Sequence, residues 1–148
     1  MEGNYLVSEK YFASEEEKQH FLDSFQKFMT DLKTLQFDSG MGGITSEKEA
    51  IINAIKEINP YKIIHCKNYS ELPFRYHTLF IGKDMSIYVE DIFGSGYQGE
   101  GSRTFEQLLK ALNVDDIFIN NHIFEKSNKD VEESNKEKTI IFSKIKEL

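Results

Sequence analysis

The chain lacks tryptophan and has a single cysteine, Cys66, among its 148 residues. One thiol cannot form an internal disulfide, so the sequence excludes a disulfide scaffold and fits a reducing compartment. Arginine is almost as scarce, since Arg75 and Arg103 are the only two. Because arginine is the usual reader of base edges, this scarcity argues against direct recognition of nucleic acid.

Long apolar runs are also absent from the sequence. The run that looks longest, residues 51–58, is interrupted by Asn53, Lys56 and Glu57, and it falls far short of the ~18 apolar residues of a membrane span. The first residues lack the basic and apolar regions of a secretory signal. We therefore expect a cytoplasmic protein that does not bind membranes.

The remaining composition is that of a globular protein, with 39% hydrophobic and 13% aromatic residues. A length of 148 residues predicts one domain, residues 1–148, with a real core. The formal net charge is −7. An acidic protein repels phosphate backbones, which disfavours nucleic acid as a partner and suits a basic protein.

The first helix is predicted by a capping box, in which Ser14 and Glu17 satisfy the backbone at the helix start. Large apolar side chains follow at helical spacing. They form one stripe, and we expect its first four members to be buried in the core: Phe21, Phe25, Phe28, Leu32 and Leu35.

Further elements follow from turn residues and from the apolar period. The sequence predicts a short strand over 5–7, a connector over 38–43, a helix capped by Ser46 and Glu49 that stops before Pro60, a strand over 61–66, a loop over 68–73, a hairpin of 75–81 and 85–93, a helix over 104–112, a strand over 116–120, a charged segment over 125–138 and a strand over 139–145. In the second hairpin strand, alternation predicts a solvent-exposed face with Ser86, Tyr88 and Glu90. This order predicts an α+β fold, a mainly antiparallel sheet with about three helices packed on it.

A glycine loop over residues 94–101 holds four of the nine glycines. It matches G-x-G-x-x-G, a nucleotide-binding pattern. Against that interpretation, Glu100 stands where a phosphate-binding loop has lysine, and Gly101 stands where it has a hydroxyl. In a dinucleotide fold, moreover, the acid near residue 115 would end a strand, whereas here it precedes one. We therefore expect no nucleotide cofactor, and we interpret the loop as structural or as partner-binding.

The side chains expected to bind a protein partner come from this loop and its borders. Tyrosine and arginine are enriched at interface hot spots, and exposed loops often carry function. The predicted partner-binding residues are Tyr97, Gln98, Glu100 and Arg103, together with Glu90 and Asp91 at the end of the preceding strand.

Histidine and cysteine give no recognisable catalytic or metal motif. Cys66 has no C-x-x-C companion, and the four histidines form no H-E-x-x-H. His65 and Cys66 are consecutive, so in a regular strand their side chains point to opposite faces and cannot form a nucleophile–base pair. His77 could approach either of them across a sheet. We predict no catalytic residue, no metal ligand and no cofactor.

The size, acidity, mixed α+β pattern and glycine-loop–helix element 94–112 together resemble the small immunity proteins of bacterial polymorphic-toxin systems. The resemblance is in the general character of the whole chain and rests on no specific motif. It implies a non-catalytic cytoplasmic protein that binds a toxin domain, with a basic domain as one option, and blocks its active site. Two other classes stay open: a small nucleotide- or ligand-binding enzyme or regulator that uses the loop 94–101, and a structural subunit or homo-oligomer.

Overall fold

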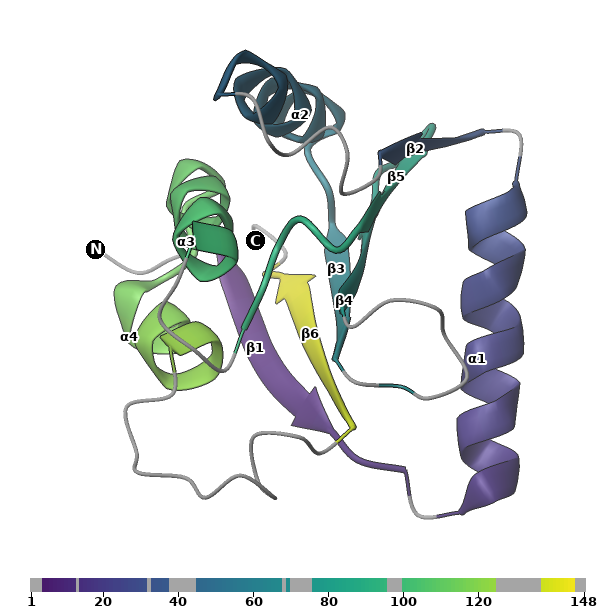
Figure 1. Ribbon diagram of the computed structural model, residues 1–148. Helices are drawn as coiled ribbons and strands as arrows, with labels where there is room; N and C mark the ends of the chain where they lie inside the picture. The colour runs from purple at the N-terminus through teal and green to yellow at the C-terminus, as the bar shows by residue number, and fades with distance from the viewer. Residues whose placement is uncertain are drawn as a thin grey trace.

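The fold is built on a six-stranded sheet (Figure 1). The computed structural model describes residues 4–12, 14–31, 33–37, 45–67, 69, 76–95, 100–124 and 137–145. Its elements in chain order are β1 (Tyr5–Lys10), α1 (Glu15–Thr30), β2 (Thr34–Phe37), α2 (Thr45–Ile58), β3 (Lys62–Lys67), β4 (Tyr76–Ile81), β5 (Ser86–Glu90), α3 (Glu100–Ala111), α4 (Asp116–Ile119), the π-helical turn η2 (Asn120–Phe124) and β6 (Lys138–Lys144).

The strand order is β1-β6-β3-β4-β5-β2. Four of its neighbouring pairs are antiparallel, and β2 joins β5 as a parallel edge strand. The fold is thus α+β with a mostly antiparallel sheet, which confirms the predicted class. The predicted hairpin is also confirmed, as β4 and β5.

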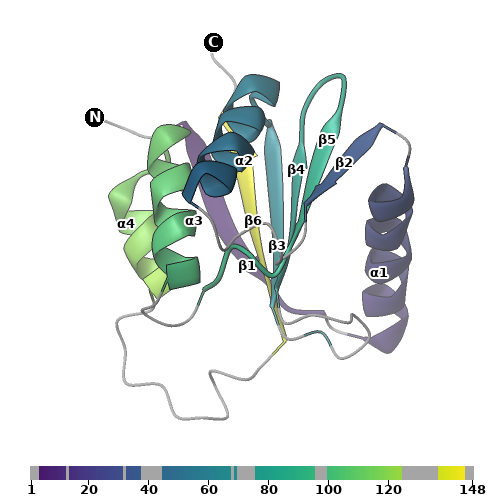
Figure 2. The same cartoon turned by 45° about the horizontal axis from the view of Figure 1, so that its top comes forward.

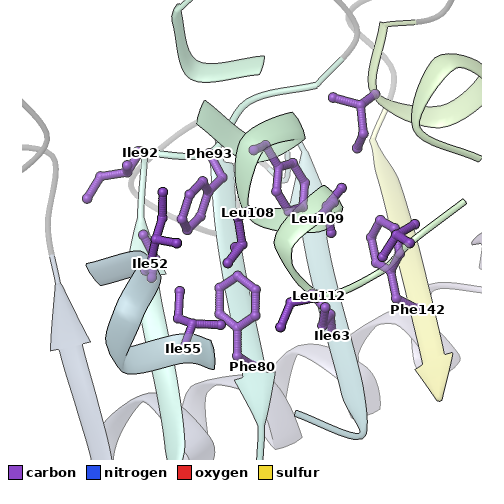
Figure 3. Close-up of a cluster of buried hydrophobic side chains, with 14 of the residues drawn as sticks. Ile52, Ile55, Ile63, Phe80, Ile92, Phe93, Leu108, Leu109, Leu112 and Phe142 are labelled. Atoms are coloured by element: carbon purple, nitrogen blue, oxygen red, sulfur yellow. The ribbon is translucent and has the colours of Figure 1, made fainter. Parts of the chain in front are cut away.

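Helices cover both faces of the sheet (Figure 2). On one face α2, α3 and α4 enclose the larger core, in which side chains from α2 and α3 meet Ile63, Phe80 and Phe142 of the sheet (Figure 3). On the other face α1 packs Leu22 and Phe25 against the middle of the sheet. Strand residues alternate between the two cores, as the period of a β-strand requires.

Helix α1 starts as predicted and ends earlier than expected. The Ser14 side chain accepts a hydrogen bond from the backbone N–H of Glu17 at 3.1 Å, as in a helix N-cap. The helix ends at Thr30, because the next residue, Asp31, takes an extended conformation. Leu35 therefore lies in β2, where its side chain is exposed.

The buried stripe of α1 differs from the predicted one. Leu22 and Phe25 are buried, Phe21 is half-buried and Phe28 is 38% exposed. The prediction was right for Phe25 and wrong for Phe28, since the buried stripe runs through Lys18, Leu22 and Phe25 and Phe21 packs at its edge. Leu32 lies outside the described residues.

The solvent-exposed face predicted for the second hairpin strand is wrong. Ser86 and Tyr88 are buried, because α1 covers this face of β5. The Tyr88 and Phe25 rings meet edge to face, with their centroids 6.0 Å apart.

Residues 116–120 form α4 and the start of η2 instead of the predicted strand. The cause is local, since the Asp115 carboxylate accepts a hydrogen bond from the N–H of Ile117 at 2.9 Å and caps a helix. Strand β2 was missed altogether. The predicted connector over 38–43, most of the loop over 68–73 and most of the charged segment over 125–138 lie outside the described residues.

The residues that flank the predicted binding loop lie at one end of the sheet. The pairing directions place the ends of β1, β3 and β5 beside the starts of β4 and β6. We call this the lower end; α1 also begins there (Figure 1). Within the described residues, no helix is both long and apolar enough to cross a membrane.

Candidate functional site

The candidate site begins where the glycine loop leaves β5. Gly94 and Ser95 are buried. The Ser95 hydroxyl lies 2.9 Å from Nε2 of His65, and the Ser95 carbonyl accepts a hydrogen bond from the Tyr76 hydroxyl at 2.9 Å. Side chains of two strands, β3 and β4, therefore hold Ser95, in the first part of the loop, through buried hydrogen bonds.

His65 is the central residue of this hydrogen-bonded group and is completely buried. Its Nδ1 lies 2.8 Å from the Thr78 hydroxyl, its ring stacks on Tyr76 at 5.6 Å between centroids, and Phe105 of α3 lies 4.8 Å away. Burial, together with the charges of nearby lysines and of His77, lowers the pKa of His65 to about 3. The ring is thus neutral, so one nitrogen donates to a hydroxyl and the other accepts from one.

The Ser95–His65 pair has the spacing of a nucleophile and its base but not their chemistry. A base with a pKa of about 3 is far too weak to take a proton from serine near neutral pH. The third group is the Thr78 hydroxyl, which cannot stabilise an imidazolium as a carboxylate does. Ser95 is also fully buried. The arrangement supports the loop and does not activate a hydroxyl.

Cys66 and His77 lie on the opposite face of the sheet, which confirms that His65 and Cys66 point apart. They are direct partners in the register of β3 and β4. Burial raises the pKa of the Cys66 thiol to about 12, although a contact with Thr139 acts the other way. The His77 ring forms a hydrogen bond with the Tyr88 hydroxyl. Neither side chain is exposed to a substrate.

Three predicted site residues lie at the lower end of the sheet. Glu90 is half-buried at the end of β5, and its Oε2 accepts a hydrogen bond from the Tyr88 hydroxyl at 3.4 Å. Asp91 is exposed and has a φ of 54°, a left-handed conformation that aspartate tolerates better than most residues. Arg103 is exposed on α3.

These three residues share one end of the sheet but not one face. The Glu90 carboxylate meets Tyr88 on the α1 face, whereas Arg103 belongs to a helix that covers the other face. Glu100 is the first residue of α3, and its side chain lies outside the described part. Tyr97 and Gln98 lie outside the described residues as well.

A second polar cluster at the lower end was missed by the sequence reasoning. The Glu9 carboxylate of β1 lies 3.1 Å from the Lys138 ammonium and 2.6 Å from Nδ1 of His122. Burial alone would raise the pKa of Glu9, but hydrogen bonds from His122, Lys138 and Tyr11 and the Lys138 charge outweigh it and lower the pKa to about 2. These residues are far apart in sequence, so no local spacing could have predicted the cluster.

Metal binding finds no support in these clusters. Across the described ranges, no group of three or more histidine, cysteine, aspartate or glutamate side chains is placed to hold a metal ion. Comparison of the chain with family models, with curated proteins and with solved structures finds no match.

Proposed function

We propose that this protein is a non-catalytic binding protein, specifically a cytoplasmic immunity protein that binds and neutralises a cognate toxin domain. The observation that carries the proposal is the location of the reactive side chains. His65, Cys66 and His77 are all buried at the middle of the sheet and bonded to neighbouring hydroxyl groups. Among the described residues, exposed carboxylates outnumber exposed lysine and arginine side chains.

The charge of the chain supports a basic partner. It has 25 acidic and 18 basic residues, a net charge of −7. Such a surface attracts a basic protein and speeds its association. For a toxin that cuts nucleic acid, exposed carboxylates would occupy the places of the substrate phosphates. Tyr97 and Arg103 would supply the anchors at the centre of the interface.

The test is to isolate the partner and then to measure protection. We would purify the tagged protein from its native cells, identify the protein that co-purifies, and express that protein alone and with this chain. We expect the partner to stop growth when expressed alone, and co-expression to restore growth through a stoichiometric complex that weakens as salt is raised.

Two results would contradict this function. One is a partner whose expression is harmless, or whose toxicity co-expression leaves unchanged. The other is saturable binding of ATP–magnesium or NAD in calorimetry that Gly96→Val abolishes, since that result would favour the enzyme or regulator class.

A further inference from the structure

A groove opens at the lower end of the sheet, between the end of β1 and the start of α1. Its volume is about 330 Å³, near the small end of the range for ligand sites. Tyr11, Phe12 and Tyr69 supply aromatic walls, and Glu15 and Glu137 supply carboxylates. Aromatic faces beside carboxylates are the surroundings in which proteins bind guanidinium and ammonium groups.

Two of the chain's own lysines already show this preference. The Lys18 ammonium lies 5.6 Å from the centre of the Tyr69 ring and bonds both oxygens of Glu137 at 2.7 and 2.8 Å. The Lys10 ammonium lies 5.4 Å from the centre of the Phe12 ring.

The two lysines are held very differently. The Lys18 side chain is 10% exposed and belongs to the floor of the groove. Lys10 is 46% exposed, and its 3.7 Å ion pair with Glu17 is equally open to solvent. Exposed pairs of this kind contribute little free energy. An incoming cation can therefore replace Lys10 over Phe12 without disturbing Lys18.

The charge at the groove favours a cation. Glu15 and Glu16 are exposed and make no ion pair with any described residue. Both lie in the first turn of α1, where the helix dipole contributes roughly half a positive charge. Two full negative charges outweigh that contribution, so the mouth of the groove stays negative.

We propose that this groove receives an arginine side chain of the protein partner. The guanidinium stacks on the aromatic wall at Tyr11 and Phe12 and pairs with the Glu15 carboxylate. This inference rests on the proposed function and gives it a second contact at the lower end, where β5 leads into Gly94 and Ser95. It commits the partner to a basic residue at the interface.

The experiment uses a small probe, so that it does not depend on finding the partner. The full chain, isotopically labelled, is titrated at low ionic strength with acetyl-arginine amide and followed by NMR. The control ligand is acetyl-citrulline amide, which has nearly the same shape without the charge. We expect saturable shifts at Tyr11, Phe12 and Glu15 with a dissociation constant on the order of millimolar, and no comparable shifts from citrulline.

Matched variants locate the contact. Glu15→Gln should weaken arginine binding at least about threefold, whereas Glu16→Gln, the same change one residue away from the groove lining, should have a smaller effect. Equal binding of citrulline, shifts confined to other surfaces, or an unchanged affinity of Glu15→Gln would each overturn the proposal. If the chain binds the arginine probe but does not protect cells from the partner, the proposed function is wrong and the arginine site stands.

Discussion

Cys66 is the only thiol of the chain, and its side chain is completely buried beneath α1. The thiolate is the reactive form, and burial raises the pKa of this thiol to about 12. We expect an aromatic disulfide reagent to modify the native protein at least about 100-fold more slowly than the unfolded chain at pH 8. Labelling in guanidinium supplies the full signal, and rapid labelling of the native protein would show that β3 is accessible.

Asp91 is the most suitable residue for testing whether negative charge at the predicted interface speeds association with the partner. Glu90 is less suitable, since its carboxylate bonds to Tyr88 and its replacement disturbs the core. We expect Asp91→Asn to slow association with the partner about two- to fivefold at low salt, because a charge that steers encounter is lost. Asparagine also accepts the φ of 54° at this position, so folding is preserved.

Asp84→Asn is the matched control, because Asp84 is an exposed aspartate in the turn between β4 and β5, at the other end of the sheet. Stopped-flow association rates compare the two variants. Equal rates for both would place the interface away from the lower end.

Among the elements, α1 allows a direct test of which helix face is in the core. Phe25→Ala should lower the free energy of unfolding by about 3–5 kcal/mol, because it empties a buried site against Tyr88 and His77. Phe28→Ala should lower it by less than about 1 kcal/mol, since that side chain is 38% exposed. Urea unfolding measures both, and equal losses would contradict the assignment of the buried face.

The elements show what the sequence could predict. Caps and turns act locally, so the start of α1, the end of α2 before Pro60 and the β4–β5 hairpin were all predictable. Burial depends on distant elements. Tyr88 alternates with apolar residues as if it faced solvent, yet α1 covers it. Residues 34–37 form a strand only because β5 is available beside them.

The candidate site was less predictable than the fold. The glycine pattern located the loop, but nothing in the sequence connects Ser95 with His65 and Tyr76. That connection requires the register of β3 and β4, which sets Thr78 opposite His65. The groove at Tyr11 likewise depends on β1, α1 and β6 meeting at one end.

For the whole molecule, buried titratable groups make stability depend on pH. The pKa of His65 falls from 6.5 to about 3 on folding, and that of Glu9 falls from 4.5 to about 2. In each case the unfolded chain binds the proton more readily, so stability is lost as pH falls, between 6.5 and 3 for His65 and between 4.5 and 2 for Glu9. The free energy of unfolding should therefore decrease from pH 7 to pH 3.

His65→Gln tests this dependence, because glutamine keeps hydrogen-bonding groups and does not titrate. We expect its free energy of unfolding to change less steeply than that of the wild type between pH 6 and pH 4, by about 1 kcal/mol per pH unit. His20→Gln, at an exposed position of α1, should keep the wild-type slope. Parallel slopes for all three proteins in urea unfolding would show that folding does not lower the pKa of His65.

The position of β6 in the sheet determines the order in which the strands can pair as the protein folds. β6 lies between β1 and β3, so among the described strands β6 is the only neighbour of β1. Because a ribosome releases the N-terminal part first, β1 stays unpaired until residues 138–144 have been synthesised. The six residues of β1 must then pair with the seven residues of β6, which are far away in sequence. Pairing them closes a long loop, and such closures are slow. Proteolytic removal of β6 would thus detach β1 as well and split the sheet, instead of trimming an edge.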